Sequence, residues 1–395
     1  MDKIEEVLTR GVEKIYPSKE ALEKALRSGK KIRLYQGFDP SMPNLHLGNM
    51  VGVLKLRQFQ DLGHEVIFVV GDFTGMIGDP TDKTSSRPEL TRKQVLENCK
   101  NWKEQVSRIL DFSGKNPVQF LFNSQWLSKL SFAELLNLAR HLTYQQTIKR
   151  DMFQKRLEQD KDIYLHEFLY PLIQGYDSVH LEVDLEVGGS DQMFNMLVGR
   201  DLMKKLKNKE KFVLTTKLLV DDKGEKIGKT TGNALFLNAS SNEMYGGIMS
   251  FPDDIISPAF ELLTLIPLQS IKSLGKELNP MDFKKRLAFE IVKMYYSEKD
   301  AKNAEKYFKE VFQKGQLPER DITVYSIKSA AKQDIVKILT TTGLAKSNSE
   351  AKRLINQGGI DIDGFTLNEF STDKIKDGTV IRAGKKKFLK IKIEK

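Results

Sequence analysis

The chain has 395 residues, more than the roughly 300 at which a single hydrophobic core stops growing, so two or three domains are expected. Its 40% hydrophobic and 29% charged residues are the composition of an ordinary globular protein and exclude a disordered or fibrous chain. The net charge of +10 allows a polyanionic partner without establishing one.

The N-terminal segment MDKIEEVLTRGVEKIY is charged throughout and lacks the apolar stretch of a signal peptide. No later run of the sequence approaches the ~20 apolar residues of a membrane span. The sequence therefore predicts a cytoplasmic protein without a membrane partner.

From 32 to about 219, short apolar runs alternate with helical patterns, which is typical of an α/β domain with a mainly parallel sheet. The pattern predicts a Rossmann-like α/β domain over 1–225, with an extra, largely helical segment at about 125–164. The expected strands are 32–35, 65–70, 118–122, 181–185 and 212–218, and the expected helices are 48–62, 93–110 and 191–206.

The single cysteine, Cys99, lies within the helical pattern of 93–110. Its position favours core packing over a catalytic thiol, because it shares one helical stripe with apolar side chains. These are Val95, Leu96, Trp102, Val106 and Leu110.

Beyond residue 238 the strand signals disappear, and helical periodicity predicts an α-helical domain over 226–315 that also carries the loop at its start. The polar stretch 316–333 is interpreted as a linker. A small α+β module is expected over 334–395, with helices at 334–342 and 349–357, the second opened by a capping box of Ser347 and Glu350. This module contains 13 Lys and Arg against 8 Asp and Glu.

The first chemical signal follows the first predicted strand and opens the first predicted helix, in the segment from Asp39 to Asn49. In an open α/β sheet this location binds nucleotides, because free backbone N–H groups and the helix dipole favour phosphate oxygens. Gly48 would let a flat base approach the backbone, and His46 and Asn49 could donate hydrogen bonds to a phosphoryl group. A turn with incidental polar residues is the alternative.

The second signal is Lys226-Ile-Gly-Lys229-Thr230, in a polar loop after the last predicted sheet strand. Two lysines on a glycine-bearing loop suit a mobile clamp on a triphosphate. The loop is not a P-loop, because Gly224 and Gly228 have only three residues between them. A solvated lysine turn remains the alternative for this loop alone.

The third signal is the spacing of Tyr170, Gln174 and Asp177 at i, i+4 and i+7 within an apolar segment. On a helix the three side chains share one face. A polar stripe in apolar surroundings needs a ligand or partner to satisfy it, which indicates a pocket for a small zwitterion.

Taken together, HLGN and KIGKT resemble the two signatures of class I aminoacyl-tRNA synthetases, commonly written HIGH and KMSKS. The segments LYQGFDP, GDFTGMIGDP, EFLYPLIQGYDS and GGSDQ resemble tyrosyl-tRNA synthetases of bacterial type, in order and over almost the whole chain. The stretch SNSEAKRLINQGGIDIDG resembles the small RNA-binding module, shared with a ribosomal protein, that ends those enzymes.

The resemblance implies that the chain activates L-tyrosine with ATP and Mg²⁺, transfers tyrosine to tRNA(Tyr), holds no tightly bound protein metal and forms a homodimer through its helical insert. It also implies that Tyr35 and Asp177 contact the phenol and that Asp79, Tyr170 and Gln174 hold the ammonium group. Gln192 would face the carboxylate, Asp191 the ribose, and Asp39 both substrates. Around the triphosphate the resemblance places His46, Asn49, Lys83, Arg87, Lys226, Lys229 and Thr230.

Two residues depart from the signatures: Asn49 replaces the usual second histidine, and Gly228 replaces a serine. Asn49 keeps a donor and Gly228 removes only a hydroxyl, so activity is expected to survive. The alternatives are a tryptophanyl enzyme, which would lack Asp177 and the terminal module, and an RNA-binding protein built on a retired synthetase.

Overall fold

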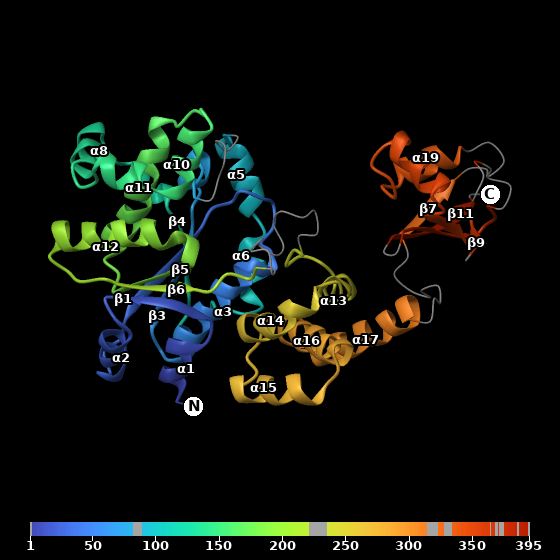
Figure 1. Ribbon diagram of the computed structural model, residues 1–395, viewed down its shortest axis with the longest axis horizontal. Helices are drawn as coiled ribbons and strands as arrows, with labels where there is room; N and C mark the ends of the chain where they lie inside the picture. Colours follow the sequence, from blue (N-terminus) through green and yellow to red (C-terminus); the bar gives the residue numbers. More distant parts are fainter. Residues whose placement is uncertain are drawn as a thin grey trace. The chain divides into compact units, whose positions relative to one another are not determined.

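The structure, a computed structural model, describes residues 2–81, 89–220, 235–313, 323–327, 334–363, 365–367, 370, 375–384 and 387–393. The chain divides into two compact units, residues 1–301 and 302–395, which are described separately (Figure 1). Within the described ranges we find no helix with the length and apolarity that a membrane span requires.

The first unit is built on a six-stranded sheet in the order β1-β6-β5-β2-β3-β4. Strands β2 to β6 are parallel to their neighbours, and β1 pairs antiparallel with β6. The strands are β1 Val12–Tyr16, β2 Arg33–Phe38, β3 Glu65–Val70, β4 Gln119–Phe122, β5 Leu185–Gly189 and β6 Phe212–Thr216. The predicted α/β fold with a parallel sheet is thus confirmed.

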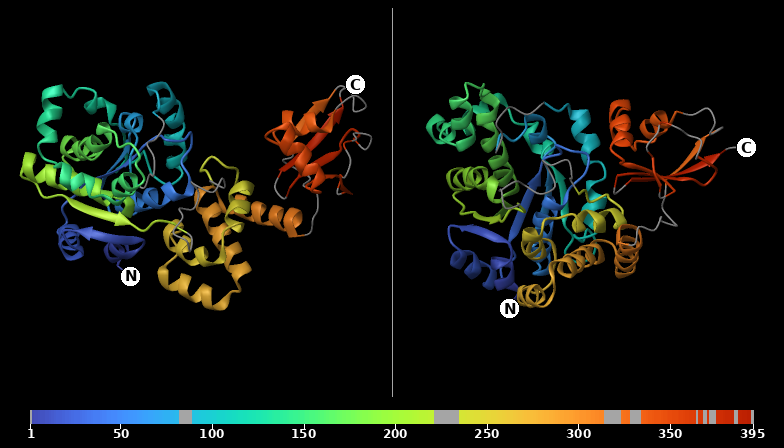
Figure 2. Two further views of the ribbon diagram at one scale, coloured as in Figure 1. Left: turned by 45° about the horizontal axis from the view of Figure 1, so that its top comes forward. Right: turned by 45° about the vertical axis from the view of Figure 1, so that its right-hand side comes forward.

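Helices cover both faces of this sheet (Figures 1 and 2). On one face, α3 (Leu47–Asp61) packs against β3 and β5. On the other face, α11 (Leu165–Leu181) and α12 (Met193–Lys207) pack against each other, and α12 contacts β5 and β6. The shorter helices α4 (Thr74–Ile77) and α7 (Ser124–Leu127) directly follow strand ends.

Successive side chains along the strands point to opposite faces of the sheet and so belong to two different cores. Tyr35, Ile67 and Val69 pack with Trp126 and Ile173 beneath α7 and α11. The intervening side chains face the opposite way, because successive residues of a strand point to opposite faces. There the rings of Phe38, Phe68 and Phe120 stack, with centroids 4.5 Å and 5.2 Å apart.

Several predicted boundaries of the sheet are wrong. The strand at 32–35 is the second of the sheet, since β1 precedes it, and the strand placed at 181–185 begins only at Leu185. Leu181 ends α11, and Glu182 terminates that helix in the left-handed conformation without a glycine to signal it.

The helix expected over 93–110 is two helices, α5 (Arg92–Cys99) and α6 (Trp102–Ser107). Cys99 is buried, which confirms core packing, and burial raises the pKa of its thiol to about 11. Leu96 does not belong to the buried stripe, because 40% of it is exposed.

The helical insert consists of α8 (Phe132–Ala139), α9 (Tyr144–Ile148) and α10 (Asp151–Glu158). Arg156 of α10 joins it to α11 through a buried ion pair with Glu167, at 2.7 Å and 2.9 Å. Both side chains are almost wholly buried, and Arg156 also donates to the carbonyl of Asp162.

The remaining elements of the first unit are helical, as predicted beyond residue 238. At the N-terminus lie α1 (Lys3–Thr9) and α2 (Lys19–Arg27). After the sheet come α13 Ser241–Met249, α14 Ile256–Leu263, α15 Leu268–Glu277, α16 Pro280–Tyr295 and α17 Glu298–Phe308. Helix α17 crosses the boundary between the units and continues as a π-helix, Lys309–Gln313.

The second unit contains a five-stranded sheet in the order β7-β11-β10-β8-β9, covered by α18 (Ile335–Thr341) and α19 (Asn348–Asn356). Its strands are β7 Thr323–Ile327, β8 Ile360–Ile362, β9 Phe365–Thr366, β10 Val380–Ala383 and β11 Lys387–Ile393. The stretch 316–333 is therefore more than a linker, because β7 lies within it and pairs in parallel with β11.

At the start of α19, the Ser347 hydroxyl accepts a hydrogen bond from the backbone N–H of Glu350. The Glu350 carboxylate accepts from the backbone N–H of Lys346 and not from that of Ser347, so the predicted capping box is only half formed.

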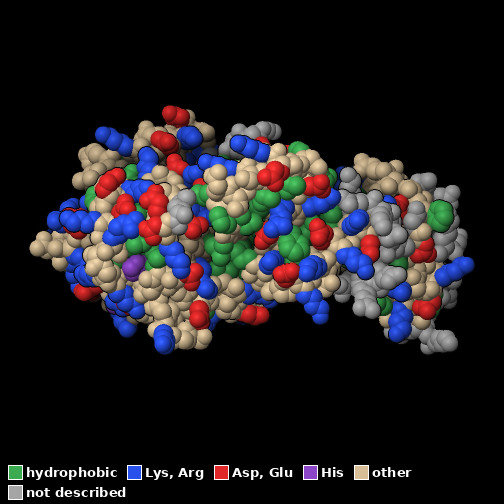
Figure 3. Space-filling view, turned by 90° about the horizontal axis from the view of Figure 1, so that it is seen from below, with side chains coloured by type: hydrophobic (Ala, Val, Ile, Leu, Met, Phe, Trp, Pro, Cys, Tyr) green, Lys and Arg blue, Asp and Glu red, His purple; other side chains and the backbone are tan. Residues whose placement is uncertain are grey.

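Charge on the surface of the first unit is mixed in sign. On the face shown in Figure 3, basic and acidic side chains are interspersed over this unit. The positive net charge of the chain therefore makes no continuous basic field on that face.

Candidate functional site

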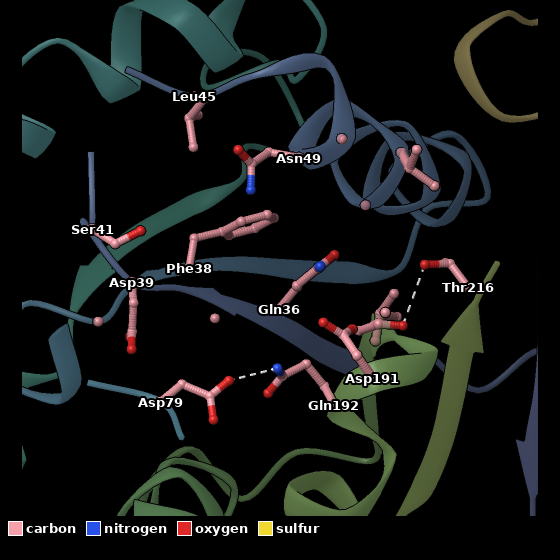
Figure 4. Close-up of a pocket in the computed structure, with 18 of the residues that line it drawn as sticks. Gln36, Phe38, Asp39, Ser41, Leu45, Asn49, Asp79, Asp191, Gln192 and Thr216 are labelled. Carbon is pink, nitrogen blue, oxygen red and sulfur yellow. Dashed lines mark hydrogen bonds between the residues drawn. The ribbon is translucent and has the colours of Figure 1, made fainter. Parts of the chain in front are cut away.

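A cavity with a volume of about 230 Å³ lies at the carboxyl ends of the parallel strands of the first unit. Its lining comes from the ends of β2, β5 and β6 and from the start of α3 (Figure 4). The chain proceeds from β2 toward β4 on one side and from β5 toward β6 on the other. The pocket thus occupies the topological switch point, where open α/β sheets bind ligands.

The start of α3 brings His46, Gly48 and Asn49 to one wall of the pocket, as predicted. The Asn49 Oδ1 atom accepts a hydrogen bond from the backbone N–H of His46, at 3.0 Å. Because the amide oxygen is engaged there, the amide nitrogen is turned toward the interior, as Figure 4 shows. Asn49 therefore presents a donor at the helix N-terminus.

The predicted stripe on α11 faces the same cavity. Tyr170, Gln174 and Asp177 all line it, which agrees with their helical spacing. The Tyr170 hydroxyl donates to Asp39 Oδ2 at 2.7 Å, and Asp39 Oδ1 accepts from the Thr74 hydroxyl at 2.6 Å. Asp39 is thus held by one donor from each of two helices.

Asp177 is a buried carboxylate at the wall of the pocket. Trp126 Nε1 donates to its Oδ1 at 2.8 Å, and Asn123 Nδ2 donates to its Oδ2 at 3.3 Å. Burial raises the pKa of Asp177 well above its ordinary value, and the hydrogen bonds from Trp126 and Asn123 oppose that shift. The site therefore maintains a desolvated acceptor beside the cavity.

Asp79, Asp191 and Gln192 meet on the opposite wall. Gln192 Nε2 donates to Asp79 Oδ2 at 2.7 Å, the contact drawn in Figure 4. Asp79 Oδ1 accepts from both the backbone N–H and the hydroxyl of Thr81. The three predicted residues are thus close together.

Tyr35 does not line the cavity. It is fully buried, and its hydroxyl is 3.0 Å from Ser178 Oγ. Burial, followed by the nearby carboxylates of Glu186 and Asp177, raises the pKa of its phenol well above the ordinary value. Five further predicted residues, Lys83, Arg87, Lys226, Lys229 and Thr230, lie outside the described residues.

The pocket also contains polar residues that the sequence did not single out. Thr74 and Asn123 follow the ends of β3 and β4, a position that could have indicated them. Glu186 could have been noticed as a carboxylate within an apolar strand. The additional polar lining residues include Gln36, Thr74, Asn123, Glu186 and Thr216.

Two glycines let carboxylates approach the backbone. A Cβ atom at Gly71 would lie 2.0 Å from Asp39 Oδ1, and one at Gly189 would lie 2.4 Å from Asp191 Oδ1. Both are far below any real contact, so a side chain at either position would displace a pocket carboxylate.

Comparison with known proteins agrees with this fold. A family model described as tRNA synthetases class I (W and Y) matches residues 27–313, and one described as tyrosine–tRNA ligase SYY-like C-terminal domain matches 316–391. The mitochondrial tyrosyl-tRNA synthetase of Aspergillus nidulans has a similar fold, with a TM-score of 0.67 at 23% identity, covering 78% of this chain and 94% of that one. The match of the family model over 27–313 shows that the chain is a class I aminoacyl-tRNA synthetase.

The curated relatives identify the family within this class. The tyrosine–tRNA ligase of Moorella thermoacetica is 41% identical over 98% of this chain and 94% of its own length. The tyrosine–tRNA ligase of Thermotoga maritima is 41% identical over 98% of this chain and 96% of its own length. The chain belongs to the tyrosine–tRNA ligase family, whose reaction forms tyrosyl-adenylate from tyrosine and ATP and then transfers tyrosine to tRNA.

The close approach at Gly71 gives a first prediction. Gly71→Ala should lower the rate of tyrosyl-adenylate formation by about a hundredfold, because a displacement of about 1 Å in a reacting site can cost that much. Pyrophosphate exchange with tyrosine measures the rate. Gly246→Ala is the matched control, since a Cβ there meets nothing within 4 Å. Normal exchange by Gly71→Ala would show that the position of Asp39 is unimportant.

Proposed function

We propose that tyrosine is activated in the pocket at the switch point, with its phenol against Asp177 and its ammonium group between Asp79 and Gln174. Gln192 faces the carboxylate, and Tyr170 supports the ammonium side. In this proposal residues 1–225 form the catalytic part, since every described lining residue lies between 36 and 219.

The observation that carries the proposal is the desolvated carboxylate of Asp177 at the wall of a small polar cavity. The Asp177 carboxylate can accept a hydrogen bond from the tyrosine hydroxyl. When phenylalanine enters, the carboxylate has no such donor. A site built to bond a hydroxyl rejects the analogue that lacks it, and tyrosine-specific synthetases are the standard example of this rule.

ATP is placed at the start of α3, where backbone N–H groups, the helix dipole and the inward amide nitrogen of Asn49 favour phosphate oxygens. The tyrosine carboxylate attacks the α-phosphorus in line, and pyrophosphate leaves. The chain contributes positioning and electrostatic stabilisation by His46 and Asn49, with no covalent intermediate. Asp191 faces the ribose. The roles of Lys83, Arg87, Lys226, Lys229 and Thr230 at the triphosphate remain predictions.

Magnesium reaches the site with the nucleotide in this proposal, because Mg²⁺ is usually held by substrate phosphates and one or two carboxylates. Asp39 and Asp191 line the pocket and are suitable carboxylates. Bound Mg²⁺ would neutralise charge on the triphosphate.

We place tRNA binding partly on the second unit and the helical region at 226–315. Lys346, Lys352 and Arg353 are exposed around α19, and Lys390 and Lys392 alternate on β11 with the buried Leu389 and Ile391. Arg382 is less available, because it forms an ion pair with Asp361. Charging of tRNA supports a cytoplasmic location, where translation uses the product.

We also propose a homodimer formed through the helical insert. The most exposed large apolar residues of the described chain include Phe132 at 75%, which begins the insert, and Leu165 at 83%, which begins α11. Leu136, Tyr144 and Leu157 within it are exposed too. Leu138 of the insert, by contrast, packs into the core with α11 and α12.

The phenol contact gives a second prediction. Asp177→Ala should lower kcat/KM for tyrosine by roughly a hundredfold, the upper range for a hydrogen bond to a charged group. Tyr35→Phe should change discrimination against phenylalanine by less than about tenfold, because its hydroxyl already bonds Ser178. Pyrophosphate exchange with both amino acids measures this, and normal tyrosine kinetics in Asp177→Ala would place the phenol elsewhere.

The insert gives a third prediction. Leu136→Glu should shift the chain from dimer to monomer in sedimentation at micromolar concentration, because a buried unpaired charge opposes association. Leu265→Glu is the matched control, since Leu265 is exposed to 49% and Leu136 to 50%. A wild-type chain that sediments as a monomer would refute the proposed dimer.

The second unit gives a fourth prediction. Lys352→Ala with Arg353→Ala should weaken tRNA binding and make its salt dependence shallower by about one to two units, ~one per lost phosphate contact. Tyrosine activation should be unchanged. Lys24→Ala with Lys30→Ala removes two exposed charges from the first unit as a control. Wild-type tRNA affinity in the Lys352 and Arg353 variant would contradict the assignment of α19 to RNA binding.

A further inference from the structure

A chain of side-chain amides runs behind the two walls of the pocket. It begins at the Glu186 carboxylate, where Gln174 Nε2 donates to Oε1 at 3.2 Å. Asn195 Nδ2 donates to Gln174 Oε1 and to Gln192 Oε1, each at 3.1 Å. The chain ends at Asp79, which accepts from Gln192 Nε2 (Figure 4). Three amides are thus strung between two carboxylates.

The carboxylate at the Glu186 end fixes the direction of the first amide. Glu186 is buried and forms an ion pair with the buried Lys211, which also donates to Ser178. Gly199 leaves room for the Lys211 side chain, because a Cβ atom at position 199 would lie only 2.7 Å from Lys211 Nζ. An ionised carboxylate only accepts hydrogen bonds, so Gln174 must turn its nitrogen to Glu186 and its oxygen away.

The same reasoning applies at the Asp79 end. A carboxylate there requires the nitrogen of Gln192, so the Gln192 oxygen also turns inward along the chain. The amide oxygens of Gln174 and Gln192 then both face the position that the Asn195 side chain occupies. Only a group with two donor hydrogens on one atom can serve both, and the Asn195 amide nitrogen is such a group.

Asn195 is fully buried and lies in α12 (Met193–Lys207). Both of its amide hydrogens are used, one for each glutamine. Its Oδ1 atom has no hydrogen-bond partner within the described part of the chain. An unsatisfied buried oxygen costs stability, so the residue is not explained by packing alone.

We propose that Asn195 is a positioning residue for tyrosine, which holds the carboxamide oxygens of Gln174 and Gln192 in place through one shared amide nitrogen. The inference rests on the proposed function of the pocket and deepens it. With Asn195 in place, Gln174 offers an oxygen to the substrate ammonium group. Gln192 retains a second N–H hydrogen for the substrate carboxylate.

Without Asn195, each glutamine keeps the bond from its nitrogen to a carboxylate but loses the donor that holds its oxygen, so the oxygen is no longer held at one position. The loss should affect the two charged groups of tyrosine and leave the phenol contact intact, because Asp177 is held separately by Trp126 and Asn123. A variant that weakens the binding of L-tyrosine but not of a ligand with the phenol alone has therefore lost positioning. General damage to the pocket would weaken the binding of both ligands.

The experiment measures the dissociation constants of L-tyrosine and of 4-ethylphenol, which has the phenol but neither ammonium nor carboxylate, by competition. Asn195→Ala and the equal-sized Asn195→Asp should each weaken L-tyrosine by about ten- to a hundredfold, as expected for lost hydrogen bonds to charged groups. Binding of 4-ethylphenol should change by less than about threefold. Asn195→Asp covers the case in which the smaller side chain prevents folding.

Asn116→Ala is the matched control. Its amide nitrogen also donates to two oxygens, the carbonyls of Gln60 and His64, but it is not in the lining of the pocket. The thermal unfolding of the Asn116→Ala variant shows how the loss of such an amide changes stability alone. This variant should bind L-tyrosine and 4-ethylphenol normally.

Equal weakening of both probes by the Asn195 variants, or no weakening of either, would overturn the inference. The proposed function has a separate criterion, because Asp177→Ala should weaken both L-tyrosine and 4-ethylphenol. If Asp177→Ala leaves both unchanged, the pocket assignment itself fails. If Asp177→Ala weakens both while the Asn195 variants weaken neither, only the role of Asn195 is wrong.

Discussion

Negative charge gathered at one edge of the sheet is the constraint on which the pocket depends. Buried carboxylates are costly unless donors reach them, and most of the donors among the described contacts are uncharged. In these contacts Asp39 accepts from hydroxyls, Asp177 from an indole and an amide, and Asp79 from Thr81 and Gln192. Among the described contacts only Glu186 has a buried lysine. The carboxylates that line the cavity are Asp39, Asp79, Asp177, Glu186 and Asp191.

This requirement explains why the donors lie on short, well-anchored elements. Asn123 and Trp126 come from the turn into α7, directly after β4, and Thr74 opens α4 after β3. On α11, Gln174 and Ser178 are one turn apart, so both reach Glu186. Carboxylates and donors are therefore ordered before any substrate arrives, which lowers the reorganisation needed during the reaction.

The sequence predicted the parts of the fold that follow from local periodicity. The strand β3 begins and ends where predicted, and the α11 stripe lines the pocket as its spacing required. The errors are non-local: β1 and β7 are recognisable only through their pairing with β6 and β11. Likewise, Leu136 and Leu138 are two residues apart in the sequence, but the neighbouring helices decide which of the two is buried. Tyr35 shows the same limit, since its bond to Ser178 depends on packing between β2 and α11.

Amide side chains raise a further point about specificity, because oxygen and nitrogen have nearly the same shape and either end can face a ligand. Three amides of this pocket are each anchored at one end by a group that can only accept or only donate. The backbone N–H of His46 takes the Asn49 oxygen, and the carboxylates of Glu186 and Asp79 take the nitrogens of Gln174 and Gln192. The direction of the other end of these three amides is therefore determined. On this basis asparagine at position 49 presents a donor to the pocket, since its anchored oxygen leaves a nitrogen directed inward.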